Sequence, residues 1–203
     1  MTSATPTTTP SSTRPRGPLD RLLRLGTLPV AALALTAMSA LYIALVALGN
    51  LTDFDSNQQF VQHVLAMDTT FKDEDVMWRA IGSSTLRDIA YVGIIVWEVL
   101  AAAILIMATV LWCGALRQGT YERARRATTL GLLMLMLLFG LGFIAVGGEW
   151  FSMWQSSKWN GLDTAGRNFM LSGFVLLLVH LPSPQWGRAD AGAPGADTPD
   201  AGR

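Results

Sequence analysis

The sequence has few of the residues that stabilise small disulfide-bonded or metal-binding domains. Only 15% of its 203 residues are charged, and it has one cysteine, Cys113, and two histidines. A single cysteine excludes an intrachain disulfide, and no Cys/His cluster has the spacing of a zinc or iron–sulfur site. No Gly-rich phosphate loop, metalloprotease motif or nucleophile elbow is present. We therefore predict no cofactor, no metal and no catalytic residue.

The sequence also has no excess of positive or of negative charge. Lys and Arg number 15 and Asp and Glu number 15, which gives a formal net charge of zero and no indication of a nucleic-acid partner. Apolar residues are abundant instead, at 51% of the chain. This share is unusual for a water-soluble domain.

The apolar residues form four runs, at about 27–49, 90–112, 127–146 and 164–181. A bilayer core of about 30 Å needs about 20 helical residues, and only the last run, which starts with Arg167 and Asn168, is short. Two alternatives are buried helices of a soluble protein and, for the first run, a cleaved signal peptide. Soluble helices of this length have a polar face, and signal peptides have shorter apolar cores. We predict an all-α membrane protein, a four-transmembrane-helix bundle.

The two ends of the chain differ from these runs. Thr, Ser and Pro dominate the first residues, and Ala, Gly, Pro and Asp dominate the last. Such segments bury too little apolar surface to fold. We predict a disordered N-terminal tail at 1–25, a membrane domain at 26–182, and a disordered C-terminal tail at 183–203.

Basic residues orient the chain. Ten of the 15 Lys and Arg residues lie in the N-terminal segment, the 117–126 loop and the C-terminal segment, against five in the other two loops. The positive-inside rule then places both termini in the cytoplasm and the 50–87 loop outside.

The external loop is long enough to have structure of its own. Apolar residues recur at helical spacing after the potential caps Asp55 and Ser56, and a second cluster spans 76–81. We predict two short helices in this loop, lying on the membrane surface over the bundle.

Small residues predict close helix packing. The first run has Ala32, Thr36, Ala40 and Ala44 at four-residue steps, and the third has glycines at 140, 142, 147 and 148. Small side chains let helices approach closely inside lipid. We therefore expect a tight bundle.

Glu98 is the most unusual residue of the apolar runs. It lies about eight residues into the second run, about 12 Å below the outer boundary. An ionised carboxylate is costly there, so we expect Glu98 to be protonated, paired or facing water. It is either a carboxyl that hydrogen-bonds a neighbouring helix or part of a site for a proton, ion or ligand.

A second group of candidates follows the third run. Trp150, Trp154 and Trp159 alternate with three polar residues, Glu149, Gln155 and Asn160. Tryptophans at a helix end form an interfacial belt, whereas the polar residues among them favour an outward-facing pocket. Both interpretations stay open.

The external loop adds three polar candidates, Asp53, His63 and Arg79. We expect His63 to be solvated and to lie across the membrane from His180, so the two cannot ligate one haem iron. Arg79 and Arg87 are the only cations expected near Glu98.

The sequence resembles the bacterial family of predicted small integral membrane proteins called domain of unknown function 2165. The matching residues are Leu41-Tyr42, Leu45-Val46-Ala47, Asn50, Thr52-Asp53, Asn57, Phe60-Val61, His63-Val64-Leu65, Met67 to Phe71, Met77 to Ile81, Trp97-Glu98, Gly147 to Gln155 and Trp159-Asn160-Gly161. The resemblance covers about 41–181. It implies a multi-pass protein of the bacterial cytoplasmic (inner) membrane and no catalytic residue.

For function we expect a non-catalytic accessory or scaffolding membrane protein. The alternative is a small carrier or sensor of a proton, ion or lipophilic ligand that uses Glu98 and the Glu149–Asn160 segment. An enzyme is the third and weakest option. The expected partners are the lipid bilayer and either another membrane protein or a second copy of the chain.

Overall fold

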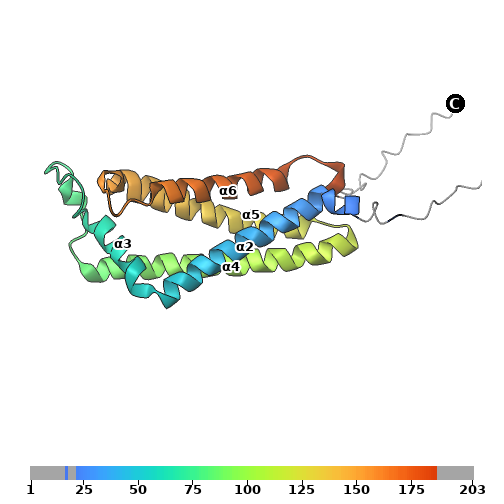
Figure 1. Ribbon diagram of the computed structural model, residues 1–203, viewed down its shortest axis with the longest axis horizontal. Helices are drawn as coiled ribbons and strands as arrows, with labels where there is room; N and C mark the ends of the chain where they lie inside the picture. Colours follow the sequence, from blue (N-terminus) through green and yellow to red (C-terminus); the bar gives the residue numbers. More distant parts are fainter. Residues whose placement is uncertain (1–16, 18–21, 187–203) are drawn as a thin grey trace, which may run out of the picture.

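The computed structural model describes residue 17 and residues 22–186, and four long helices dominate it (Figure 1). They are α2 (Leu28–Thr52), α4 (Ser84–Gln118), α5 (Glu122–Met136) with its π-helical continuation η3 (Leu137–Trp150), and α6 (Leu162–His180). The spans comprise 25, 35, 29 and 19 residues and are long and apolar enough to cross a bilayer. Together with the absence of strands in this part of the chain, they confirm the all-α four-helix prediction.

The sides of the bundle are apolar. On α6, for example, Met170, Phe174 and Leu177 are exposed, and similar leucines and valines are exposed on α2 and α4. Water would disfavour so continuous an apolar surface, whereas lipid tails accommodate it and each helix satisfies its own backbone hydrogen bonds. The chain is therefore an integral membrane protein.

Small residues bring α2 close to its neighbours, as the stripe predicted. Ala32, Thr36 and Ala40 are buried, but Ala44 is only partly buried and Ile43 continues the buried face. The reason is that steps of four residues exceed the 3.6 residues of a helical turn, so the stripe rotates out of the contact.

Glycines make two of the closest contacts between the helices. A Cβ on Gly140 would lie 2.8 Å from the Phe169 ring, and one on Gly148 would lie 2.8 Å from Leu162. Gly142, in contrast, has no neighbour nearer than 3.9 Å. The predicted glycine surface is thus used at some positions only.

A cap of short elements covers one end of the bundle, which we call the cap end (Figure 1). It comprises α3 (Phe54–Ala66), the 3₁₀ turn η2 (Met77–Arg79) and the 3₁₀ turn η4 (Met153–Gln155). The prediction of short helices in the 50–87 loop is confirmed by α3 and η2, with two differences. The first helix starts at Phe54, directly after α2, because only Asp53 leaves the helical conformation between them. The second cluster forms only the turn η2, since Ala80 is extended and the Ile81 N–H donates to the Leu65 carbonyl.

The opposite, terminal end contains both ends of the described chain. Gln185 in the 3₁₀ turn η5 (Pro184–Trp186) accepts a hydrogen bond of 2.8 Å from the Leu28 N–H, and Trp186 packs on Trp112 and Tyr121. The predicted tails at 1–25 and 183–203 therefore include two short turns, η5 and η1 (Arg24–Gly26). Apart from these turns and their described neighbours, both tail predictions fall outside the described residues.

Candidate functional site

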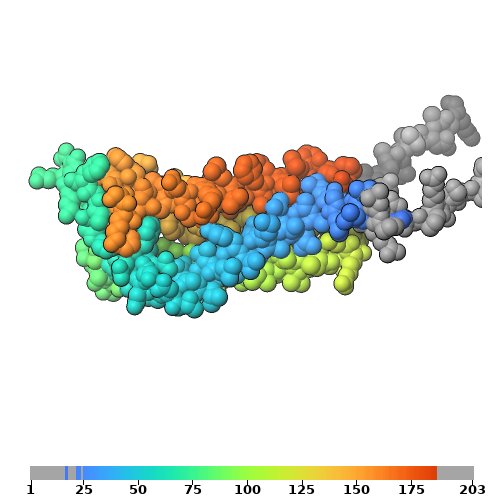
Figure 2. Space-filling model, viewed as in Figure 1, coloured from blue at the N-terminus to red at the C-terminus, as the bar shows by residue number. Residues whose placement is uncertain are grey.

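A cavity of about 520 Å³ lies among α2, α3, α4, η3 and α6 toward the cap end. We call it the central cavity, and its volume is in the range of small-molecule sites. In Figure 2 a hollow is visible between α2 and α6, where the two helices diverge. Its lining combines an acid, a lysine, four asparagines and several aromatic rings: Glu98, Lys158, Asn50, Asn57, Asn160, Asn168, Tyr42, Phe60, Tyr91, Phe139, Phe143 and Trp159.

Glu98 lies inside the bundle, on the face of α4 that meets α2. Its side chain is 3% exposed, and its Oε2 accepts a hydrogen bond of 2.6 Å from Asn50 Nδ2. The Tyr91 hydroxyl, about two turns before Glu98 in α4, donates a hydrogen bond of 3.3 Å to the Asn50 carbonyl. Among the described residues Glu98 forms no ion pair. Glu98 therefore forms a hydrogen bond to a neighbouring helix, the first of the two alternatives from the sequence, and it also lines the central cavity. The second alternative, a site for a proton, ion or ligand, stays a prediction.

Asn168 on α6 is the second buried polar residue of the cavity. Its Nδ2 donates to the Tyr42 hydroxyl at 2.6 Å, which links α6 to α2. The residue is 3% exposed, yet its Oδ1 has no hydrogen-bond partner in the described chain. A buried acceptor without a donor is costly. An amide inside an apolar span is the same signal that singles out Glu98 in the sequence, so this signal could also have identified Asn168, which the sequence-based prediction placed only at the start of the short fourth run.

Aromatic rings form much of the remaining wall. The Phe60 ring of α3 lies 6.2 Å from Phe143 and 6.3 Å from Trp159, and Phe139 lies 5.8 Å from Phe143. These rings come from the cap, from η3 and from the loop before α6. The cavity thus depends on the cap being folded onto the bundle.

The His63 side chain is 35% exposed, so it is in part solvated as the sequence suggested, but it also has partners in the cap. Its ring stacks on Trp159 with centroids 4.7 Å apart, and its Nδ1 lies 2.7 Å from Asp68 Oδ2. His63 belongs to the cap and His180 to the terminal end of α6, so the two histidines lie at opposite ends of the bundle, as expected.

The aromatic segment after the third span divides into two parts. Trp159 and Asn160 line the central cavity, whereas Glu149, Trp150 and Trp154 do not and are exposed. Of the three polar residues expected in a pocket, only Asn160 lines this cavity. The first part contributes to a cavity, and the second is placed as an interfacial belt would be.

The belt residues contact the external loop. Trp150 packs edge-on against Trp78 at 5.6 Å, and the Arg79 guanidinium lies 5.1 Å from the Trp150 ring centre. Trp154 packs against Phe71 at 5.9 Å. Arg79 is therefore engaged by rings and does not pair with Glu98.

The last two candidates, Gln155 and Asp53, lie in or beside the cap. Gln155 Oε1 accepts a hydrogen bond of 2.9 Å from the Phe71 N–H. Asp53 is exposed at the junction of α2 and α3 and does not line the central cavity.

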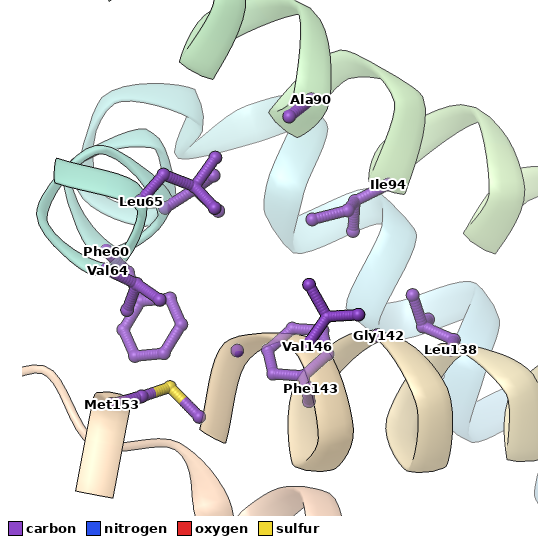
Figure 3. Close-up of a pocket in the computed structure, with 12 residues that line it drawn as sticks. Phe60, Val64, Leu65, Ala90, Ile94, Leu138, Gly142, Phe143, Val146 and Met153 are labelled. Carbon is purple, nitrogen blue, oxygen red and sulfur yellow. The ribbon is translucent and has the colours of Figure 1, made fainter. Parts of the chain in front are cut away.

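Two apolar spaces adjoin the central cavity. The first, of about 210 Å³, lies among α3, α4 and η3, and Figure 3 shows that Met153 supplies the only heteroatom among its labelled side chains. The second, of about 230 Å³, lies between α2 and α6, and we call it the lateral groove. Tyr42 and Asn168 line both the lateral groove and the central cavity, so this hydrogen-bonded pair stands between them.

Within residues 17 and 22–186 no group of three or more His, Cys, Asp or Glu side chains is placed to hold a metal ion. The chemistry that this arrangement offers is binding through hydrogen-bond acceptors and aromatic rings.

A family model described as "Predicted small integral membrane protein (DUF2165)" matches residues 28–182. No curated protein and no solved structure shows significant similarity to the chain.

Proposed function

The chain belongs to this family of small integral membrane proteins, and we propose that it is a ligand-binding protein that holds a small lipophilic molecule in the central cavity. It would act as a carrier or a sensor of that molecule. This is the alternative that Glu98 suggested in the sequence. It replaces scaffolding as the first candidate because the structure has a cavity with a polar wall.

One observation carries the proposal, which is the buried amide oxygen of Asn168 without a hydrogen-bond donor. Inside a membrane protein, polar groups are satisfied by neighbouring helices, ordered water or a ligand. Here the unused oxygen belongs to a residue that lines the same cavity as Glu98. A ligand that brings a donor would remove the cost of leaving this acceptor unpaired.

A cavity-filling variant tests the proposal. In Val46→Phe an added ring occupies the central cavity, because Val46 lines it from α2. Val96→Phe is the matched control, since Val96 on α4 is exposed on the apolar side of the bundle. Wild type and Val96→Phe should co-purify with the same small molecule, identified by mass spectrometry of solvent extracts, and Val46→Phe should not. Identical extracts from all three folded proteins would contradict ligand binding in this cavity.

Scaffolding remains the second candidate because the cap has exposed aromatic residues. Phe71 is 73% exposed and Trp78 is 70% exposed, and both lie at the cap end of the bundle. Such rings suit either the lipid interface or contact with another membrane protein or a second copy of the chain. Gentle solubilisation followed by co-purification tests this role. A stoichiometric partner lost in Phe71→Ser and Trp78→Ser, but kept in Val46→Phe, would favour scaffolding.

We also propose that the protein lies in the bacterial cytoplasmic membrane with both termini in the cytoplasm. The terminal end supports this orientation because the last turn of α4 and the start of α5 contain four arginines, Arg117, Arg123, Arg125 and Arg126. The cap, the central cavity and its aromatic wall would then lie toward the outer surface.

A further inference from the structure

We infer that the ligand of the central cavity is a lipophilic primary or secondary amine, bound as its ammonium ion with the head facing Glu98 and Asn168 and the hydrocarbon chain in the lateral groove. This inference rests on the proposed function, because it specifies the chemistry of the molecule that the same cavity holds.

The buried polar atoms that remain free in the cavity are acceptors. Glu98 Oε2 already accepts from Asn50, so its second oxygen is available, and Asn168 Oδ1 accepts from no described group. Both residues line one cavity from opposite helices, α4 and α6. A head group that donates two or three hydrogen bonds therefore fits these atoms, which a primary ammonium can do and an ether, ester or carboxylate cannot.

A positive head also complements the charge and the walls. Glu98 has no ion-pair partner in the described chain, and an ammonium head beside it would stabilise the ionised carboxylate. The rings that surround the cavity, among them Tyr42, Phe139 and Trp159, present faces that attract cations. A neutral lipid would lack this electrostatic gain.

One cation on the lining opposes this preference. Lys158 lies at the rim, where it is exposed and its Nζ is 4.7 Å from the centre of the Trp159 ring. Solvent and salt screen an exposed charge of this kind, whereas Glu98 is buried and screened much less. The buried acid therefore dominates the selection of charge at the bottom of the cavity.

The chain of the ligand has an apolar path that begins at the polar head. Tyr42 and Asn168 separate the central cavity from the lateral groove, whose other walls include Leu35, Leu135 and Val175. Along α2 the groove extends from Tyr42 to Leu35, which is about 10 Å at the rise of an α-helix. Exposed Met38 and Leu171 flank it, so the groove opens to the surrounding lipid.

A series of head groups on one alkyl chain tests the inference with the unaltered protein. The full chain in phosphatidylcholine nanodiscs is equilibrated near pH 7 with radiolabelled decylamine, decanol or decyltrimethylammonium, and retention by empty nanodiscs is subtracted. Decylamine is protonated at this pH, as a Lys side chain is. We expect it to bind about tenfold or more tightly than decanol, because hydrogen bonds to charged groups are the stronger ones. Decyltrimethylammonium should bind more weakly than decylamine since it has no N–H donor.

Matched variants locate the bound head. Glu98→Gln and Asn168→Leu should each weaken decylamine binding by about tenfold or more. Glu149→Gln and Gln118→Leu make the same acid-to-amide and amide-to-leucine changes at exposed positions outside the cavity, and they should leave decylamine binding unchanged. Decylamine binding that survives both cavity variants would overturn the inference.

The remaining outcomes separate this inference from the proposed function. Equal specific binding of decylamine and decanol would overturn the amine assignment and leave a lipophilic site in place. No retention of any probe above empty nanodiscs, combined with identical extracts from wild type and Val46→Phe, would overturn both. Ser39→Phe narrows the lateral groove and should weaken the binding of decylamine but not of butylamine. Equal losses of binding for the two amines would show that the alkyl chain does not lie in the groove.

Discussion

Asn50 in the last turn of α2 donates a hydrogen bond of 2.6 Å to the Glu98 carboxyl group in α4. The two residues join the first and second spans at the depth where the central cavity lies. The same bond therefore bears on both the stability of the bundle and the shape of the candidate site.

A double-mutant cycle measures this link. Asn50→Ala and Glu98→Ala should each lower the free energy of unfolding, and the pair should show a coupling energy of about 0.6 to 2 kcal/mol, the range for hydrogen bonds in membrane and soluble proteins. Reversible unfolding in mixed detergent micelles gives the four values. Strictly additive losses would mean that the bond does not contribute to the folded state.

Two helical glycines form a matched pair for close packing. A Cβ on Gly131 would lie 2.5 Å from Leu105 Cγ, whereas one on Gly93 would have no neighbour within 4 Å. Gly131→Ala should therefore destabilise the protein by about 1 to 3 kcal/mol through overpacking. Gly93→Ala should be neutral or stabilise by up to about 1 kcal/mol, since alanine favours helix. Thermal denaturation of both variants in the same detergent compares them; similar melting temperatures would contradict the close approach of α4 and α5.

A buried indole N–H near the terminal end has one hydroxyl group as its hydrogen-bond acceptor. Trp112 is fully buried, and its Nε1 donates to Thr128 Oγ1 at 2.8 Å, which in turn lies 3.3 Å from Thr36 Oγ1. Thr128→Val keeps the shape and removes the acceptor, so it should cost about 1 to 3 kcal/mol. Thr109→Val is the control because the Thr109 hydroxyl bonds only to Leu105 in its own helix. Equal stability of the two variants would show that the Trp112 bond is dispensable.

The proposed orientation predicts opposite labelling at the two ends of the bundle. In a Cys113→Ala background, an impermeant thiol reagent applied to intact cells should label Ser56→Cys, which lies in α3 at the cap end. It should label Gln118→Cys, at the terminal end of α4, only after the membrane is opened. Labelling of position 118 from outside would reverse the topology and place the central cavity toward the cytoplasm.

Local signals in the sequence predicted the elements better than their ends. The second span begins at Ser84 and not near 90, because the Ser83 hydroxyl caps the helix by accepting from the Leu86 N–H. The third span continues to Trp150, past the predicted end at 146. The length of an apolar run indicates which residues lie in the bilayer core, whereas the ends of a helix depend on caps and on contacts outside the bilayer.

The sequence by itself determined that the chain has four membrane-spanning helices, because apolar runs of about 20 residues match the thickness of the bilayer core and a helix satisfies its own backbone in lipid. It also determined that Glu98 is exceptional, since a carboxyl inside an apolar run is costly wherever the helices lie. Only the tertiary structure decided that Asn168 and Tyr42 join this residue around one cavity while Glu149 and Trp154 lie outside it. Tyr42, Glu98 and Asn168 are far apart in the chain. The rotation of each helix about its axis decides which side chains share a space, and this rotation follows from the packing of small residues against particular neighbours.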